Sequence, residues 1–306
     1  MIRISVISPI YKAEKIIPEL INRILHEVSI LTKEFEIILV DDGSPDSSWS
    51  IIESICLENF KVKGVKLSKN FGQHYAITAG IQISKGDYVI VMDCDLQDDP
   101  VYFSELLAAA NNGADIVYTS KQERKHGYLK NVSAYLFNLI FNFLADNQKS
   151  NNNIGNFSLI SRKVVNSFLL ISDCRRHYLM ILNSLGFNYK IISINHSVRY
   201  NGKSSYSFDK LVRHAIDGIT FNSTKLLWFS IKLGFILCLF SIIYFMYILY
   251  FFLYRDMLPG YASIMAGLIF STGILLTFMG IMGIYIGNIF VQVKNRPLYF
   301  IDKIIN

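Results

Sequence analysis

Two long stretches without a charged residue constrain the fold of this 306-residue chain more than any other feature. They cover residues 233–254 and 257–293, and each is longer than the roughly 20 apolar residues that a helix needs to cross a bilayer. Core helices of soluble proteins seldom lack a polar face over such a length. Arg255 and Asp256 separate the two stretches, and Pro259 follows shortly after them. The pattern therefore predicts a hairpin of two transmembrane helices.

We expect these helices at about residues 229–254 and 262–291, within a membrane segment of residues 229–293. The flanking charges predict their orientation, because the cytoplasmic ends of membrane helices carry an excess of Lys and Arg. Basic residues flank the outer ends of the hairpin, at Lys225, Lys232, Lys294, Arg296 and Lys303. Both chain termini are therefore expected in the cytoplasm, and residues 294–306 are expected to form a cytoplasmic tail.

Residues 1–228 are expected to form a soluble α/β domain. Hydrophobic residues make up 52% of the chain and charged residues 18%, which excludes a disordered protein. Runs rich in Ile and Val predict buried parallel strands at residues 4–8, 36–41, 63–67, 87–92 and 115–119. Helical patterns fall between them, near residues 14–31, 46–57, 72–84 and 100–112. This alternation is typical of a doubly wound, Rossmann-like sheet, in which ligands bind at the carboxyl ends of the strands.

Two further stretches, near residues 130–146 and 206–227, are predicted to be amphipathic helices next to the membrane. The first is rich in aromatic residues, and the second belongs to a basic segment that leads into the hairpin. Such helices suit an anionic membrane surface. The alternative for each is an ordinary solvated helix face.

Two acidic residues, Asp41 and Asp42, lie at the carboxyl end of the second predicted strand. Carboxylates at the carboxyl end of a strand can accept hydrogen bonds from the base or ribose of a nucleotide. Residues 43–46, Gly-Ser-Pro-Asp, supply a turn, and Asp46 suits the N-cap of the next helix. Because Asp-Gly turns are common, an ordinary turn is the alternative for this motif alone.

Four carboxylates follow the fourth predicted strand, at Asp93, Asp95, Asp98 and Asp99. They repel one another unless a cation lies among them. Hard oxygen ligands at this position favour Mg²⁺ or Mn²⁺ bound together with the phosphates of a substrate. Asp98 and Asp99 come just before Pro100, which is typical of a helix start. Asp93 and Asp95 are therefore the candidate metal ligands.

Together, the two motifs resemble those of family 2 glycosyltransferases with a GT-A fold. The resemblance is to the polyprenyl-phosphate branch, which includes bactoprenol glucosyltransferases and dolichol-phosphate mannosyltransferases. It extends over nearly the whole chain and implies a GT-A domain followed by a two-helix transmembrane hairpin. The matching segments are SPIY at 8–11, VDDGS at 40–44, LSKNFG at 67–72, TAG at 78–80, GD at 86–87, DCDLQ at 93–97, GNFSL at 155–159, SRKVV at 161–165, RYNGKSSY at 199–206, DGIT at 217–220 and KNRP at 294–297.

The resemblance also implies roles for individual residues. The nucleotide-sugar would be bound by Pro9, Tyr11, Asp41, Asp42 and Asp93. Mg²⁺ or Mn²⁺ would be bound by Asp93, Asp95 and Gln97. The acceptor phosphate would lie near Lys121, Arg124, Lys130, Arg199, Ser204 and Tyr206. Arginine suits a phosphate because its planar guanidinium donates two parallel hydrogen bonds. Ser205 stands where the family usually has a lysine.

One position departs from the family pattern. The family has Gly-Asp-Phe before its sixth strand, and that Asp is the proposed catalytic base, whereas this chain has Asn156. An asparagine cannot accept a proton. A phosphate acceptor has no need of a base, because its second pKa is about 6 and it is mostly dianionic at pH 7. We therefore expect activity with Asn156 in place, where it could donate a hydrogen bond to the phosphate or orient an arginine.

These features predict an inverting, metal-dependent hexosyltransferase. It would transfer a sugar from a nucleotide-sugar to undecaprenyl phosphate at the cytoplasmic face of a bacterial inner membrane. The product would serve O-antigen, lipopolysaccharide or other cell-envelope glycans. The expected partners are the nucleotide-sugar, the polyprenyl phosphate and the membrane, without nucleic acid. The sequence leaves open the sugar, the base and the oligomeric state, including a homo-oligomer.

Two alternatives stay open at this point. The first is a membrane-anchored glycosyltransferase whose acceptor is a glycolipid or saccharide hydroxyl, in which case Asp98 and Asp99 are the nearest candidates for a base. The second is a non-catalytic relative, which Asn156 favours. The mutually repelling pair of Asp93 and Asp95 argues against that second alternative. A processive polysaccharide synthase is disfavoured, because the chain has no Gln-x-x-Arg-Trp motif.

Overall fold

The structure is a computed structural model that describes residues 3–121, 154–174, 176–195, 225–254 and 260–305. The chain divides into two compact units. The globular unit comprises residues 1–125, 151–204 and 296–306, and the helical unit comprises residues 126–150 and 205–295. The globular unit therefore contains the end of the chain as well as its beginning.

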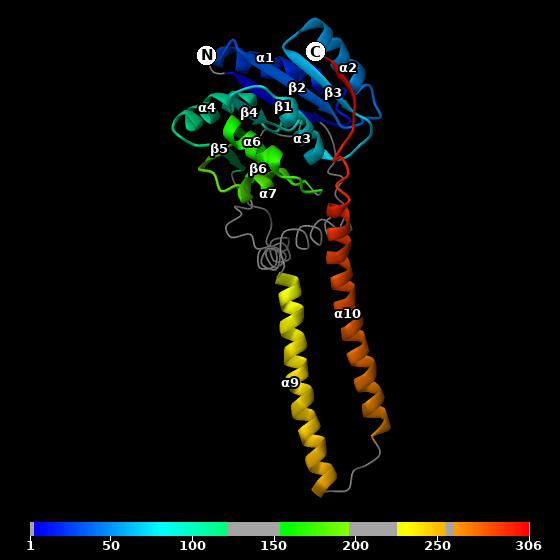
Figure 1. The fold of residues 1–306 in the computed structure, drawn as a ribbon. Coiled ribbons are helices and arrows are strands. Elements are labelled where there is room, and N and C mark those ends of the chain that lie inside the picture. The colour runs from blue at the N-terminus through cyan, green and yellow to red at the C-terminus, as the bar shows by residue number, and fades with distance from the viewer. Residues whose placement is uncertain (1–2, 122–153, 175, 196–224, 255–259, 306) are drawn as a thin grey trace. The chain divides into compact units, whose positions relative to one another are not determined.

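Strands and helices alternate in the first part of the globular unit, as the sequence predicts (Figure 1). All five strands and all four helices expected between residues 4 and 119 are confirmed. The elements run β1 (Ile4–Ile10), α1 (Ile17–Leu31), β2 (Phe35–Asp41), α2 (Ser48–Glu58), β3 (Val62–Leu67), α3 (Gln73–Ile83), β4 (Tyr88–Val91), η1 (Pro100–Tyr102), α4 (Phe103–Asn111) and β5 (Ile116–Lys121). They are followed by β6 (Ile154–Ser161), α6 (Arg162–Leu170), α7 (Tyr178–Ser184), β7 (Tyr189–Ile194) and, after the helical unit, β8 (Ile301–Ile305).

The eight strands form one mixed sheet in the order β7-β5-β6-β4-β1-β2-β3-β8. Strands β1 to β4 are parallel where they pair, as are β5 and β7. Strand β6 runs antiparallel to both β4 and β5, and β8 runs antiparallel to β3. The sheet is thus the mixed α/β sheet of a GT-A-like fold, and not a wholly parallel one.

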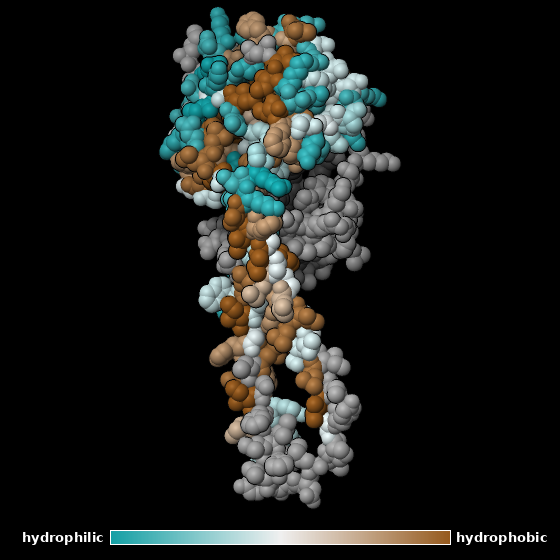
Figure 2. Space-filling view, turned by 45° about the vertical axis from the view of Figure 1, so that its right-hand side comes forward, coloured by the Kyte–Doolittle hydropathy of each residue, from teal (hydrophilic) through white to brown (hydrophobic). Residues whose placement is uncertain are grey.

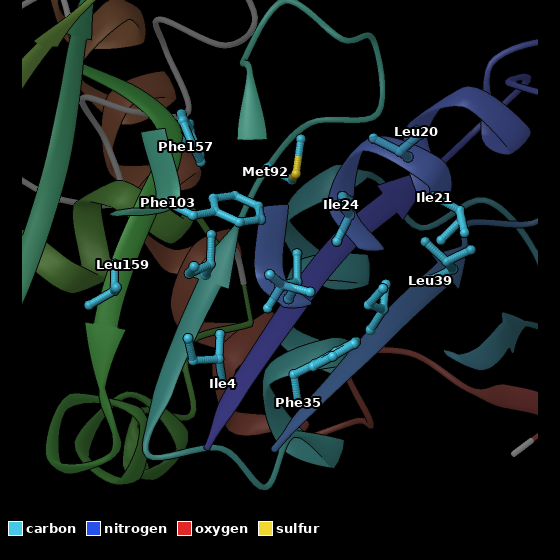
Figure 3. Close-up of a cluster of buried hydrophobic side chains, with 14 of the residues drawn as sticks. Ile4, Leu20, Ile21, Ile24, Phe35, Leu39, Met92, Phe103, Phe157 and Leu159 are labelled. Atoms are coloured by element: carbon cyan, nitrogen blue, oxygen red, sulfur yellow. The ribbon is translucent and has the colours of Figure 1, made fainter. Parts of the chain in front are cut away.

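The hydrophobic core lies on both faces of this sheet, because successive strand residues point to opposite sides. In β2, Ile37 and Leu39 pack with α1 and α4 on one face, whereas Ile38 and Val40 pack with α3 on the other. Figure 3 shows the first face, where side chains of β1 and β2 meet Leu20 and others of α1. Burial on both faces explains why the strands read as nearly continuous runs of Ile and Val.

The segment expected to be a cytoplasmic tail, residues 294–306, contains an edge strand that the sequence does not predict. Strand β8 pairs with β3, with Ile304 opposite Val65 and Lys303 opposite Lys66. Lys303 Nζ also lies 2.8 Å from Glu53 Oε1 of α2. The segment IDKII is short and has two adjacent charged residues, so it lacks the regular alternation of a half-buried strand. Its sequence carries no signal of a partner strand more than two hundred residues earlier.

The helical unit contains α9 (Lys225–Tyr254) and α10 (Tyr261–Val293), which run side by side in Figure 1. Their bounds include those of the two expected helices. By length and composition both could cross a membrane: the windows Leu227–Tyr244 and Phe270–Val293 have mean hydropathies of 2.0 and 2.1 and are not buried. Where the helices are coloured in Figure 2, brown and tan hydrophobic residues predominate, with paler polar positions among them. The hydroxyls of Thr272 and Thr277 bond to carbonyls one turn earlier, which satisfies them within the helix.

Candidate functional site

The strand order brings four segments to one end of the sheet. Strand β1 lies between β2 and β4, and the direction in which the chain adds strands reverses there. The carboxyl ends of these parallel strands lie at one end of the sheet. Antiparallel β6 begins at the same end, because Val91 of β4 pairs with Ser158. Open α/β sheets bind their ligands at such a reversal.

Asp42 anchors residues 68–72, which connect β3 to α3 and which we call the 68–72 loop. Its Oδ1 accepts a hydrogen bond from the Phe71 amide at 2.7 Å, and its Oδ2 accepts one from the Gly72 amide at 2.8 Å. Its own amide donates to the Ile10 carbonyl at 2.9 Å. The side chain is 3% exposed. Asp42 therefore joins three segments of the site, a role that the sequence alone does not predict.

The turn after Asp42 packs directly on the same loop. Asp41 is buried, and both of its carboxylate oxygens lie 3.3 Å from the Ser44 amide, which donates to them. Gly43 has a φ of +63°, and a Cβ there would lie 2.4 Å from the backbone carbonyl carbon of Lys69. Only glycine combines that backbone conformation with so close an approach.

Hydrogen bonds also join the loop after β1 to the start of α2. The Lys12 amide donates to Ser44 Oγ at 3.2 Å, and the Ala13 amide donates to Ser48 Oγ at 3.0 Å. Asp46 accepts from the Ser48 amide at 3.2 Å, so it supports the helix start as expected, although Ser47 occupies the N-cap. Pro9 is buried within β1, whereas the Tyr11 side chain is 44% exposed. Part of the Tyr11 side chain is thus accessible next to the carboxyl end of β1.

Asp93 is linked to the 68–72 loop through Gln73, the first residue of α3. The Gln73 side-chain amide donates a hydrogen bond to Asp93 Oδ1. Because Gln73 follows Gly72 directly, the start of α3 connects the carboxylate of Asp42 with that of Asp93. Gln73 carries no site motif of its own in the sequence. The available signal was its position immediately after the LSKNFG motif, at a predicted helix start.

A tight turn holds the other acidic residues after β4. Asp95 Oδ1 accepts from the Gln97 amide at 3.2 Å, and Leu96 between them is 3% exposed with a φ of +57°. Asp99 accepts from the Val101 amide at 3.1 Å, which confirms its expected role at a helix start. Asp98 is 7% exposed. The structure thus separates Asp95, which bonds within the turn, from Asp99, which caps the helix start.

Burial sets the electrostatics of the site. It raises the pKa of Asp41 and of Asp42, and it outweighs the hydrogen bonds that each carboxylate accepts. Burial, together with the charge of Asp93, raises the pKa of the Cys94 thiol to about 12. Cys94 is therefore a neutral thiol at physiological pH and unsuited to be a nucleophile. Two adjacent buried carboxylates favour a ligand that donates hydrogen bonds or carries positive charge.

Residues 5–169 of the chain match glycosyl transferase family 2. The chain belongs to this family. An uncharacterized glycosyltransferase of Synechocystis sp. is 32% identical over 99% of this chain and 96% of its own length. The SfII prophage-derived bactoprenol glucosyl transferase of Shigella flexneri is 31% identical over 98% of both chains. These relatives confirm the family resemblance expected from the motifs.

A solved structure of glucosyl-3-phosphoglycerate synthase from Mycobacterium tuberculosis, in complex with Mn²⁺ and UDP-glucose, aligns with 72% of this chain and 77% of its own. The sequence identity is 16% and the TM-score 0.49. This likeness is too low to bear on the substrate or metal of the present chain.

Asn156 lies near the start of β6 in this family 2 glycosyltransferase. Strand β6 pairs antiparallel with β4. The start of β6 therefore lies at the end of the sheet where β4 leads into Asp93. The Asn156 carbonyl accepts a hydrogen bond from Ser158 Oγ at 2.8 Å. The residue is partly exposed. Asn156, which replaces the family's Asp, thus lies at the same end of the sheet as the acidic motifs.

Most of the predicted acceptor residues fall outside the part of the chain that the structure describes. Lys121 ends β5, opposite Ile194 of β7, but the position of its side chain is not described. The same holds for the whole of the predicted amphipathic helices near 130–146 and 206–227, apart from the three residues that begin α9. The remaining acceptor residues outside the described ranges are Arg124, Lys130, Arg199, Ser204 and Tyr206.

The donor atoms at the site suit a hard divalent cation shared with a substrate. Asp93 and Asp95 are two residues apart at the end of β4, and Gln97 adds an amide oxygen. Within the described residues, no group of three His, Cys, Asp or Glu side chains could hold a metal ion. Mg²⁺ and Mn²⁺ are commonly bound by one or two carboxylates plus substrate phosphates. The residues therefore fit a cation that arrives with a nucleoside diphosphate rather than one held by the protein alone.

Proposed function

We propose that this family 2 glycosyltransferase transfers a sugar from a nucleotide-sugar to undecaprenyl phosphate at a bacterial inner membrane. The observation that carries the proposal is the 31% identity, over 98% of both chains, to a bactoprenol glucosyl transferase. Bactoprenol is the polyprenol whose phosphate would be the acceptor. The product would enter O-antigen, lipopolysaccharide or another cell-envelope glycan.

The donor would bind across the ends of β1, β2 and β4. Tyr11 would stack on the base, and Asp41 and Asp42 would face the nucleoside. Mg²⁺ or Mn²⁺, held by Asp93, Asp95 and Gln97, would neutralise the charge that develops on the leaving diphosphate. The position of Asp93 and Asp95 directly after β4 and the partly exposed side chain of Tyr11 support these roles.

The reaction would be a single in-line displacement with inversion. An oxygen of the acceptor phosphate forms the new bond to the anomeric carbon, and the bond from that carbon to the nucleoside diphosphate breaks with its electron pair. A dianionic phosphate monoester has no proton to lose in this step. Asn156 would donate a hydrogen bond to the phosphate, where an aspartate would repel it. Lys121, Arg124, Lys130 and Arg199 would supply positive charge to the acceptor, with Ser204 and Tyr206 nearby.

The chain would be anchored by α9 and α10 as a transmembrane hairpin, with both termini in the cytoplasm. Strand β8 supports this topology. Because β8 pairs with β3, the chain must return after α10 to the side of the membrane that holds the globular unit. Two crossings satisfy that requirement. Basic residues at both outer ends of the hairpin support the same orientation.

The test is transfer of radiolabelled sugar to undecaprenyl phosphate by the full chain in membranes, across a panel of nucleotide-sugars. We expect a chloroform-soluble product with at least one donor, lost in Asp93→Ala and in excess EDTA. Undiminished transfer in EDTA would reject the metal. Transfer only to saccharide or glycolipid hydroxyls would reject the phosphate acceptor, and inactivity with every donor and acceptor would support a non-catalytic relative.

The pH profile gives a second test of the acceptor. With a phosphate nucleophile, the acidic limb should follow the acceptor's own second pKa, near 6. Asn156→Asp should then change turnover by about tenfold or less, because a base has almost no proton to remove. A gain of 10²-fold or more in Asn156→Asp would indicate an acceptor hydroxyl that needs a base.

A further inference from the structure

The C-terminal segment contacts the 68–72 loop as well as the sheet edge. The Ser68 amide donates to the Phe300 carbonyl at 2.9 Å, directly beyond the ladder between β3 and β8. The Phe300 ring lies 6.4 Å from the Phe71 ring, centroid to centroid, at an interplanar angle of 46°. Both ends of the loop's backbone are therefore engaged, Ser68 by Phe300 and Phe71 by Asp42.

A second contact fixes the same segment to α3. The Tyr299 hydroxyl bonds to Gln82 Oε1, near the end of that helix, and the Tyr299 side chain packs against the core on this face of the sheet. Helix α3 begins at Gln73, which bonds to Asp93. Residues 299 and 300 thus contact the 68–72 loop and α3. The loop bonds to Asp42, and the first residue of α3 bonds to Asp93.

We propose that Phe300, with Tyr299 and β8, positions the 68–72 loop and thereby the donor-binding site. The proposal rests on the proposed function of that site. Phe300 would be a positioning residue and not a contact to the donor. It acts through Phe71 and Gly72, whose amides hold the carboxylate of Asp42. The turn at Gly43 and the Asp42 carboxylate hold the loop on one side. Phe300 contacts the Phe71 ring and the Ser68 amide, so loss of the Phe300 ring should loosen the loop amides.

The chain supplies a matched control on the same strand. Phe300 is 57% exposed and Ile304 is 52% exposed, so neither substitution to alanine opens the core. Ile304 lies opposite Val65 in the ladder and away from the loop. A general weakening of β8 would affect both variants equally, whereas loss of loop positioning would affect only Phe300→Ala.

The experiment measures UDP and GDP binding with Mn²⁺ by calorimetry, using the full chain in detergent. We expect Phe300→Ala to weaken binding of the preferred diphosphate about three- to tenfold, the range for one lost aromatic contact. Ile304→Ala should stay within about twofold, and both melting temperatures should stay near that of the wild type. Equal affinity of Phe300→Ala and wild type, or equal losses in the two variants, would overturn the inference.

Hydrogen exchange without nucleotide separates this inference from the proposed function. The amides of Phe71 and Gly72 should exchange faster in Phe300→Ala than in wild type and Ile304→Ala. Unchanged exchange would reject the positioning role even if the enzyme is active. A wild type that binds neither diphosphate would reject the donor site and, with it, the role of Phe300 there.

Discussion

Gly43 decides whether the turn after β2 can lie against the 68–72 loop. Gly43→Ala must accommodate a φ of +63° and a Cβ 2.4 Å from loop backbone, so the loop has to shift. We expect binding of nucleoside diphosphate to fall at least tenfold, because small displacements of positioning groups are costly. The control is Gly186→Ala, where φ is +68° but a Cβ meets nothing within 4 Å. Binding that survives in both variants would contradict the close contact.

Gln73 provides a second test at single-residue scale. Gln73→Leu removes the hydrogen bond to Asp93 while keeping a side chain of similar size. On the proposal that Asp93 binds the metal, Gln73 orients a metal ligand, and loss of such a group typically costs 10- to 100-fold in metal affinity. We therefore expect the Mn²⁺ concentration for half-maximal nucleotide binding to rise by about that factor. Asn111→Leu, at an exposed position of α4, should leave it unchanged; an equal rise there would point to a general effect.

The site could be predicted from the sequence only in part, for a physical reason. Asp41 ends a strand, and Asp42, Asp93 and Asp95 follow strands. The carboxyl ends of parallel strands meet at one end of the sheet whatever the details of packing. The bond between Gln73 and Asp93 depends on where one side chain points at a helix start. Patterns of hydrophobicity carry no information on that direction. The hydrogen bonds from the loop amides to Asp42 cannot be predicted from the sequence for the same reason.

At the scale of one element, β2 carries buried acids at both ends with opposite shifts in pKa. Burial raises the pKa of Asp41 and Asp42 at the carboxyl end. Burial also acts on Glu36, at the amino end, but hydrogen bonds from Ser5, Lys63 and the Lys85 amide outweigh it and lower the pKa of Glu36. The negative charge of Glu36 is thus stabilised in the folded protein. The charges of Asp41 and Asp42 are destabilised by burial, at the end of the strand where the ligand would bind.

The lowered pKa of Glu36 makes a prediction about stability and pH. A carboxylate with a depressed folded pKa stabilises the fold above its unfolded pKa of about 4.5 and loses that contribution as the pH falls through the folded value. Glu36→Gln should therefore cost about 1–3 kcal/mol at pH 7, since Lys63, 2.9 Å away, loses its partner. The difference from wild type should shrink as the pH drops below about 4.5.

Thermal or denaturant unfolding of both proteins between pH 3 and 7 measures this difference. Glu19→Gln is the control, because its pair with Arg23 is exposed and contributes little. A difference between Glu36→Gln and wild type that stays constant with pH would contradict the assigned shift.

The elements that the sequence predicts well are those buried on both faces of the sheet. All seven residues of β1 and of β2 are buried, and such runs have few alternative structures. Strand β8 is mostly exposed, and its partner β3 is remote in the chain. Its existence depends on a long-range pairing that local patterns do not encode.

For the whole molecule, β8 makes the apolar hairpin an insertion into the globular unit and not an appendage to it. A chain that ends at Thr224 loses β8 along with α9 and α10. A chain in which residues 225–293 are replaced by a flexible linker of about 20 residues keeps β8. We expect the second to melt at a higher temperature and to stay monodisperse, whereas the first leaves the β3 edge unpaired and aggregates. Equal melting temperatures in the two proteins would contradict a stabilising role for β8.

The pairing of β3 with β8 also has a consequence for biosynthesis. Residues 68–300 separate the two strands, and ribosomes add about 5–20 residues per second. The outer edge of β3 therefore stays unpaired for on the order of ten to fifty seconds until β8 is synthesised. If the hairpin spans the membrane as proposed, that partner arrives only after both helices have been inserted and the chain has come back to the starting side. The sheet would then be completed only in chains whose two helices have been inserted into the membrane.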